Sequence, residues 1–247
     1  MEHFNFKEPK SPIIENVGTR SIAKSFLANV FLFMTGALTI TGVISYLFGT
    51  EPALLQFLYN IQDGVLKPTM LAYIVMFAPI GLVLLMSFRF NKMSAIGLMS
   101  VFVIYSILMG MSLSTIFLVY SGASIFKTFL VTAGTFGIMA VLGYTTKTDL
   151  TKFGSILIMG VIGLIIASIV NMIWYSTTMD LIISLIGVLI FTGLTAYDVQ
   201  KLKQIGEGVT YGSEPASKLA IMGALSLYLD FINLFLFLLR FLGNNRD

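Results

Sequence analysis

Long apolar stretches separated by short polar loops run through almost the whole chain. Seven of them reach the length of a membrane-spanning helix, which needs about 20 mostly apolar residues. Their expected limits are 25–48, 69–88, 94–118, 124–144, 155–175, 181–198 and 219–240. The pattern predicts an all-α integral membrane protein built as a seven-transmembrane-helix bundle.

Composition agrees with this pattern. Hydrophobic residues make up 57% of the 247 residues and charged residues only 11%, with a mean hydropathy of +0.92. A soluble domain carries about twice that share of charge, roughly 25%. The net charge of +3 does not indicate nucleic-acid binding, because the basic residues lie in short loops and no basic-aromatic motif accompanies them.

The first 24 residues are polar and contain His3, the chain's one histidine. They lack the early apolar core of a signal peptide, so residues 1–24 are expected to form a cytosolic tail and residues 25–247 a single membrane domain. With the N-terminus inside, 11 of the 15 Lys and Arg residues fall on the cytosolic side. Arg240 and Arg246 then lie outside, and a re-entrant or half-spanning seventh segment is the alternative that would avoid this.

Several function classes lose their support. The chain has no cysteine, which excludes disulfides, Cys-ligated zinc and thiol nucleophiles. Nucleotide-binding and hydrolase motifs are absent from the sequence as well. We expect a protein that is not an enzyme and needs no cofactor.

Asp230 is the one charged residue in the apolar run 219–239. A carboxylate at the centre of a spanning helix costs roughly 3 kcal/mol on insertion scales, so such a residue is a functional candidate by default. Ser226 and Asn233 lie on the same helix face as Asp230, at helical spacing. A hydrogen-bonded knot that only joins helices is the structural alternative.

Asp198 ends the sixth apolar segment and is followed by Lys201 and Lys203. Pairing with these lysines at the membrane boundary is one interpretation. The other is approach to Asp230, because the sixth and seventh segments are expected to be antiparallel neighbours. Two close, desolvated carboxyls do not both ionise readily, so such a pair can exchange a proton near neutral pH.

The same two carboxylates could hold a hard cation weakly. Calcium prefers 6–8 oxygen ligands, and Thr195 and Asn233 could add part of that shell. A partial shell suits a permeant ion better than a stored one, because the ion must also leave. Arg89, at the end of the second segment, is a candidate latch that would neutralise the pair in a closed state. Its alternative role is an anchor on the cytosolic side.

Two stretches resemble the signatures of the Bax inhibitor-1 family: residues 195–203, TAYDVQKLK, and residues 224–235, ALSLYLDFINLF. The resemblance implies a seven-helix fold with a central last helix, and an aspartate pair that senses pH and gates a calcium leak. By motif position the pair corresponds to Asp198 and Asp230, while Arg89 fits the family's latch by position only. Animal members suppress cell death, and one bacterial member inhibits a membrane-anchored ATP-dependent protease. The short tail and absent cysteines point to a bacterial member in the inner membrane.

Three functions follow as hypotheses. The first is a pH-sensitive calcium leak channel of the membrane. The second is a non-conducting regulator that binds and inhibits another membrane protein, such as an ATP-dependent protease. The third is a proton-coupled transporter of small solutes. The direction of the pH response stays open, because protonation would weaken both a latch to Arg89 and the binding of a cation.

Overall fold

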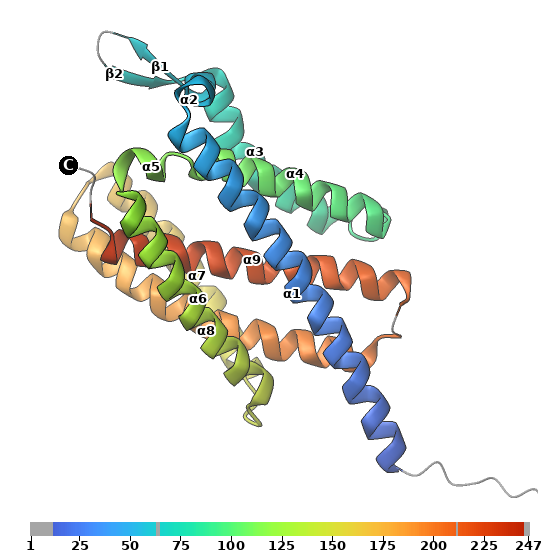
Figure 1. Ribbon diagram of the computed structural model, residues 1–247. Helices are drawn as coiled ribbons and strands as arrows, with labels where there is room; N and C mark the ends of the chain where they lie inside the picture. Colours follow the sequence, from blue (N-terminus) through green and yellow to red (C-terminus); the bar gives the residue numbers. More distant parts are fainter. Residues whose placement is uncertain (1–11, 63–64, 211, 245–247) are drawn as a thin grey trace, which may run out of the picture.

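The computed structural model describes residues 12–62, 65–210 and 212–244. Within these residues, seven helices are long and apolar enough to cross a membrane, which confirms the predicted all-α membrane bundle (Figure 1). The long helices are α1 (Pro12–Thr50), α3 (Met70–Arg89), α4 (Ala95–Leu113), α6 (Gly122–Thr145), α7 (Thr151–Ile173), α8 (Thr177–Gly208) and α9 (Glu214–Leu242).

Short helices and a β-hairpin lie at one end of the bundle. The predicted loop 49–68 contains helix α2 (Pro52–Leu58) and an antiparallel hairpin of β1 (Tyr59–Gln62) and β2 (Val65–Pro68), in which Tyr59 pairs with Pro68. Helix α5 (Ile116–Val119) lies at the same end, between α4 and α6 (Figure 1). We call this the hairpin end of the bundle. The opposite end carries the α8–α9 connection, where Ser213 caps α9 by accepting a hydrogen bond from the Ala216 amide.

Helix α8 corrects the predicted boundary of the sixth segment. The apolar run stops at Asp198, but the helix continues ten residues further, to Gly208. Lys201 and Lys203 look like loop residues in the sequence, yet a helix can extend past the apolar layer with its charges in the polar one. Lys203 does so while its Nζ donates to the Tyr144 carbonyl at 3.0 Å. Asp198 therefore lies inside a helix rather than at its end.

The two terminal helices also differ in extent from their apolar runs. Helix α1 begins at Pro12, within the stretch predicted as a tail, whereas residues 1–11, including His3, lie outside the described residues. Helix α9 is one unbroken helix of 29 residues. At 1.5 Å per residue it is about 43 Å long, which is enough to cross a bilayer without a break. A full crossing by this helix stays a prediction. Arg240 near its end pairs with Asp180 at 3.3 Å.

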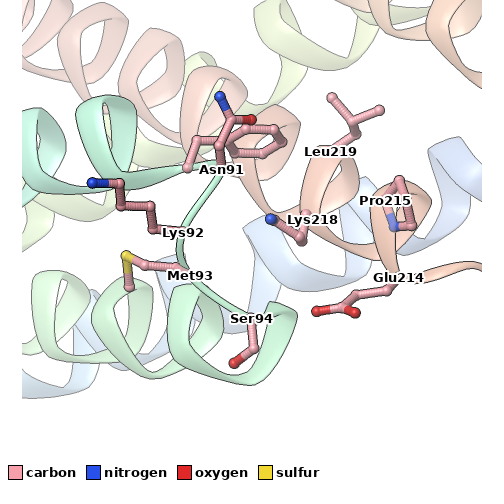
Figure 2. A pocket seen from close by; sticks show the side chains of 9 residues that line it. Asn91, Lys92, Met93, Ser94, Glu214, Pro215, Lys218 and Leu219 are labelled. Atoms are coloured by element: carbon pink, nitrogen blue, oxygen red, sulfur yellow. The ribbon is translucent and has the colours of Figure 1, made fainter.

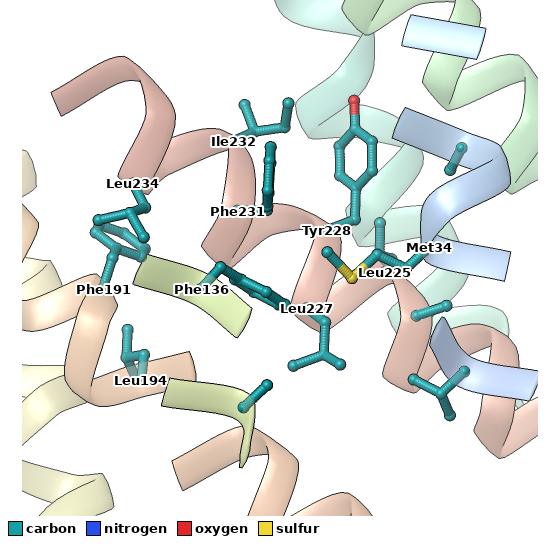
Figure 3. Packing of buried hydrophobic residues seen from close by; sticks show 14 of the residues in the cluster. Met34, Phe136, Phe191, Leu194, Leu225, Leu227, Tyr228, Phe231, Ile232 and Leu234 are labelled. Atoms are coloured by element: carbon teal, nitrogen blue, oxygen red, sulfur yellow. The ribbon is translucent and has the colours of Figure 1, made fainter. Parts of the chain in front are cut away.

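Helix α9 is the most buried of the seven long helices in the described bundle. It contacts α1, α4, α6 and α8, whereas α3 packs mainly on α4 and α7 mainly on α8. Figure 3 shows Tyr228, Phe231 and Leu234 of α9 among side chains of neighbouring helices. The Phe231 ring lies 5.5 Å from that of Phe136 on α6. These contacts support the predicted central position of the last helix, which stays a prediction.

Two glycines allow close approach to α8 around Asp198. A Cβ atom on Gly143 of α6 would overlap the backbone of Ala196. A Cβ atom on Gly154 of α7 would overlap the ring of Tyr197. Small residues are what membrane helices use to bring their backbones together. The segment of α8 that carries Asp198 is therefore held tightly from two sides.

Candidate functional site

The packing of α8 against α9 brings together three predicted residues. Ser226 on α9 donates a hydrogen bond from Oγ to Oδ2 of Asp198 on α8 at 2.5 Å. Asp230 lies one helical turn after Ser226, on the same face of α9. We call Asp198, Ser226 and Asp230 the aspartate site.

Asp230 is the buried member of this site. Its side chain is 5% exposed, and its Oδ2 atom has no hydrogen-bond partner among the described residues. An unsatisfied buried polar group costs about 1–3 kcal/mol, and a charged one costs more. Asp198 is less completely buried, and Lys201 lies one turn along the same helix. The two carboxyls therefore differ in their access to water and to positive charge.

Thr192 was not singled out from the sequence, but it shares a property with Asp230. Its Oγ1 atom is also buried without a partner in the described part of the chain. It lies on α8, the helix that carries Asp198. Helix α8 contacts α9 more extensively than any other element, so both unpartnered atoms belong to one pair of helices. A threonine in an apolar helix gives no sequence signal that separates it from others whose hydroxyls bond their own backbone.

Two predicted supporting residues bond their own helices in this structure. Thr195 donates to the Phe191 carbonyl, and Asn233 donates to the Leu229 carbonyl, both at 2.8 Å. Both residues lie on the helices of the aspartate site. Across the described residues, no group of three or more His, Cys, Asp or Glu side chains could hold a metal ion. Two carboxylates alone supply few of the 6–8 oxygens that calcium prefers, so cation binding here would be weak.

Arg89 is exposed at the end of α3, and its side chain makes no ion pair within residues 12–62, 65–210 and 212–244. The next residue, Phe90, lies 4.9 Å from the Nζ atom of Lys218, near the start of α9. Figure 2 shows this junction, a cavity of about 520 Å³ between the α3–α4 loop and α9. From Lys218 to Asp230 the helix rises about 18 Å. A latch between Arg89 and the aspartates therefore requires α3 to move, and it stays a prediction.

A second polar cluster lies on another face of α9. The Tyr228 hydroxyl and Thr41 Oγ1 are 2.8 Å apart, and Thr41 donates to the Ser106 carbonyl at 2.9 Å. Because Thr41 gives its one proton to Ser106, Tyr228 is the donor to Thr41. All three residues are buried. This cluster ties α9 to α1 and α4, and sequence periodicity could place Tyr228 away from the Asp230 face but could not identify its partners.

Gln200 links the site to the α6–α7 connection. Its Oε1 accepts from the Leu150 amide, and its Nε2 donates to the Thr148 carbonyl, both at 2.8 Å. Gln200 follows Asp198 by two residues on α8. The connection between α6 and α7 is thereby fixed against the helix that presents Asp198.

Comparison with known proteins agrees with this architecture. The family model described as inhibitor of apoptosis-promoting Bax1 matches residues 23–247. An uncharacterized protein of Borreliella burgdorferi is 44% identical over 226 residues, which cover 92% of this chain and 94% of the relative. The inner membrane protein YbhL of Escherichia coli K12 is 42% identical over 239 residues, which cover 96% of this chain and 98% of YbhL. An uncharacterized protein of Caulobacter vibrioides is 42% identical over 230 residues, which cover 91% and 90%. The chain is therefore a membrane protein of the Bax inhibitor family.

Proposed function

We propose that this protein is a pH-sensitive calcium leak channel, in which the aspartate site senses protons and lines the ion path. The observation that carries the proposal is the Ser226–Asp198 hydrogen bond one helical turn from the buried, unpartnered Asp230 carboxyl. An ionisable pair inside an apolar bundle is an expensive way to join two helices, since neutral polar residues would serve. The cost is understandable if the charge of the pair has a task.

Proton sensing follows from the difference between the two carboxyls. When one proton is shared between close acids, its gain or loss changes the charge of the pair as a unit. Asp198 accepts a hydrogen bond from Ser226, and Lys201 lies one helical turn further along α8. Asp230 has neither of these partners. The pair therefore offers a single unit of charge that pH can switch between helices α8 and α9.

Ion passage would use the same groups. Two carboxylates attract a divalent cation, while the small number of ligands keeps the site weak enough for the ion to leave. Thr195 and Asn233 would join only if their side chains gave up the bonds to their own helices. Calcium is the substrate of this proposal and is not a resident cofactor.

The proposed location is the bacterial inner membrane, with the N-terminus in the cytosol. The likeness to the inner membrane protein YbhL supports the membrane, and the distribution of Lys and Arg supports the orientation. In this orientation the hairpin end lies outside the cell, and the α8–α9 connection lies inside. Protons of the cytosol would then reach the aspartate site from the end where Lys201 and Lys203 lie.

Calcium efflux from liposomes that contain only the purified protein tests the proposal. We expect an efflux above that of empty liposomes, with a rate that changes as the pH crosses neutrality. A pull-down from native membranes is the second experiment, and it identifies any membrane protein that binds this one. Absence of efflux together with recovery of a stoichiometric membrane protease would replace the proposal by the non-conducting regulator, in which the aspartates are structural. Saturable exchange of a small solute would replace it by the transporter.

A further inference from the structure

A second cavity, separate from the aspartate site, opens at the hairpin end of the bundle. It measures about 540 Å³ and lies among α1, α5, α6 and α9. Phe231 and Phe235 of α9 form part of its wall, and Tyr46 and Phe126, which are 58% and 63% exposed, belong to its lining as well. Because this part of the chain crosses the membrane, an opening between its helices faces lipid rather than bulk water.

The wall contains an unused hydrogen-bond donor. Ser45 lines the cavity, is 4% exposed, and its Oγ atom has no hydrogen-bond partner in the described chain. Two other lining residues carry hydroxyls: Thr41, which is already bonded to Tyr228 and Ser106, and Tyr46, which is 58% exposed. A water molecule needs two to four polar partners to be held in a cavity, so these walls favour hydrocarbon. A single acceptor group beside Ser45 would satisfy its hydroxyl.

The depth of Ser45 identifies what such an acceptor could be. The span of α1, Ile22–Thr50, has 29 residues and is about 43 Å long, close to the full thickness of a bilayer. Ser45 lies five residues from its end, about 7 Å in, where the polar interface meets the hydrocarbon core of about 30 Å. The ester carbonyls of phospholipids lie at this level. From Tyr46 to Leu38 the lining extends about 12 Å further toward the bilayer centre.

A positive charge directly follows one of the lining residues in the sequence. Lys127 is exposed on α6 directly after Phe126, and it is five residues from the start of that helix, as Ser45 is from the end of α1. A lysine at this depth extends its side chain toward the headgroup layer. Lipid phosphate is the anion found in that layer. The positive charge of Lys127 is therefore complementary to the phosphate of a phospholipid headgroup.

We propose that this cavity binds one phospholipid, whose acyl chain fills the apolar part, whose ester carbonyl accepts a hydrogen bond from Ser45 and whose phosphate pairs with Lys127. The Ser45 hydroxyl is buried, so the bond requires rotation about its Cα–Cβ bond toward the cavity. The site is independent of calcium flux and of the aspartate site. It would hold α1, α6 and α9 together at the hairpin end.

Two glycines of α1 provide a matched test. Gly42 lines the cavity, and a Cβ atom there would meet nothing within 4 Å, so Gly42→Leu adds a side chain at the cavity wall with room for its first carbon. Gly36 on the same helix also has open space around it but does not belong to the lining, so Gly36→Leu is the control. The measurement is native mass spectrometry of protein released from nanodiscs of phosphatidylethanolamine and phosphatidylglycerol.

We expect the wild-type protein and Gly36→Leu to retain one phospholipid. Gly42→Leu should lose it and still unfold in a cooperative thermal transition, which shows that the variant is folded. Ser45→Ala should bind about fivefold more weakly, the equivalent of one hydrogen bond. Lys127→Gln should reduce the preference for phosphatidylglycerol. Equal retention by the two leucine variants would overturn the proposal. So would a wild-type protein that carries no phospholipid, or one whose cavity is covered by a second copy of the chain.

Discussion

The hydroxyl of Ser226 donates to the carboxylate of Asp198 across the α8–α9 contact, with 2.5 Å between the two oxygens. This bond contributes to how the two helices face each other, and Asp230 follows Ser226 one turn later on the same face of α9. Hydrogen bonds to charged acceptors are stronger than those between neutral groups. Ser226, which precedes Asp230 by one turn, therefore links α9 directly to the other aspartate.

Ser226→Ala should destabilise the bundle and alter the pH response of the leak. It removes the donor to Asp198, and the loss of a partner from a buried acceptor costs about 1–3 kcal/mol. Thermal unfolding in detergent and calcium efflux at several pH values measure the two effects. Ser184→Ala is the control, since the Ser184 hydroxyl bonds the Asp180 carbonyl within α8 and does not touch the site. An identical pH profile for wild type and Ser226→Ala would show that the Ser226–Asp198 bond plays no part in the pH response of calcium efflux.

Gly143→Ala should lower the free energy of unfolding. Its Cβ atom would overlap the Ala196 backbone, and forcing apart a tight contact costs about 1–3 kcal/mol. Gly137→Ala on the same helix is the matched control, because a Cβ atom there meets nothing within 4 Å and alanine favours a helix. Chemical denaturation in detergent distinguishes them. Equal stability of both variants would contradict the close approach of α6 to α8.

Tyr228→Phe should cost about 0.6–1.5 kcal/mol, the range found for single hydrogen bonds in membrane and soluble proteins. It deletes the hydroxyl that bonds Thr41 and leaves the aromatic contact with Tyr105, whose ring is 5.4 Å away. Tyr105→Phe is the comparison, because the Tyr105 hydroxyl makes no hydrogen bond within the described chain, so that its loss should cost less stability. Unfolding midpoints of the two variants give the difference. A larger effect at Tyr105 would refute the assignment of the Thr41 cluster to Tyr228.

Arg89→Gln should raise calcium efflux if Arg89 latches the closed form. The ion pair is not formed in the structure, so the latch belongs to a state in which α3 has moved on α4. Lys92→Gln removes an exposed charge from the adjacent loop and serves as the control. Efflux rates at one pH compare the two variants. Equal rates for both variants and the wild type would leave Arg89 as an anchor on the cytosolic side.

Helical periodicity in the sequence predicted those parts of the site that lie on a single helix. It placed Ser226 and Asp230 on one face of the last helix and gave the antiparallel neighbour that carries Asp198. It could not decide whether Asn233 and Thr195 face the carboxyls, because both side chains can bond a carbonyl four residues earlier at little cost. That choice depends on how closely the neighbouring helices pack.

Tertiary contacts account for the other differences. The charges of Lys201 and Lys203 suggested that a helix ends at Asp198, whereas the helix extends with them to Gly208. The Thr41–Tyr228 contact joins residues 187 positions apart, which no local pattern specifies. The hairpin after α2 lies in residues 49–68, the connection between the first two apolar segments.

Calcium efflux of Asp230→Asn as a function of pH tests the central claim most directly. Asparagine keeps the size of the side chain but carries no charge at any pH. The account predicts that this variant loses the pH response and, across the whole range, conducts at the rate of the wild type at its acidic limit. Asp180→Asn, which breaks only the pair with Arg240 at the hairpin end, should keep the wild-type profile. An Asp230→Asn variant with the wild-type rate and pH profile would contradict the account.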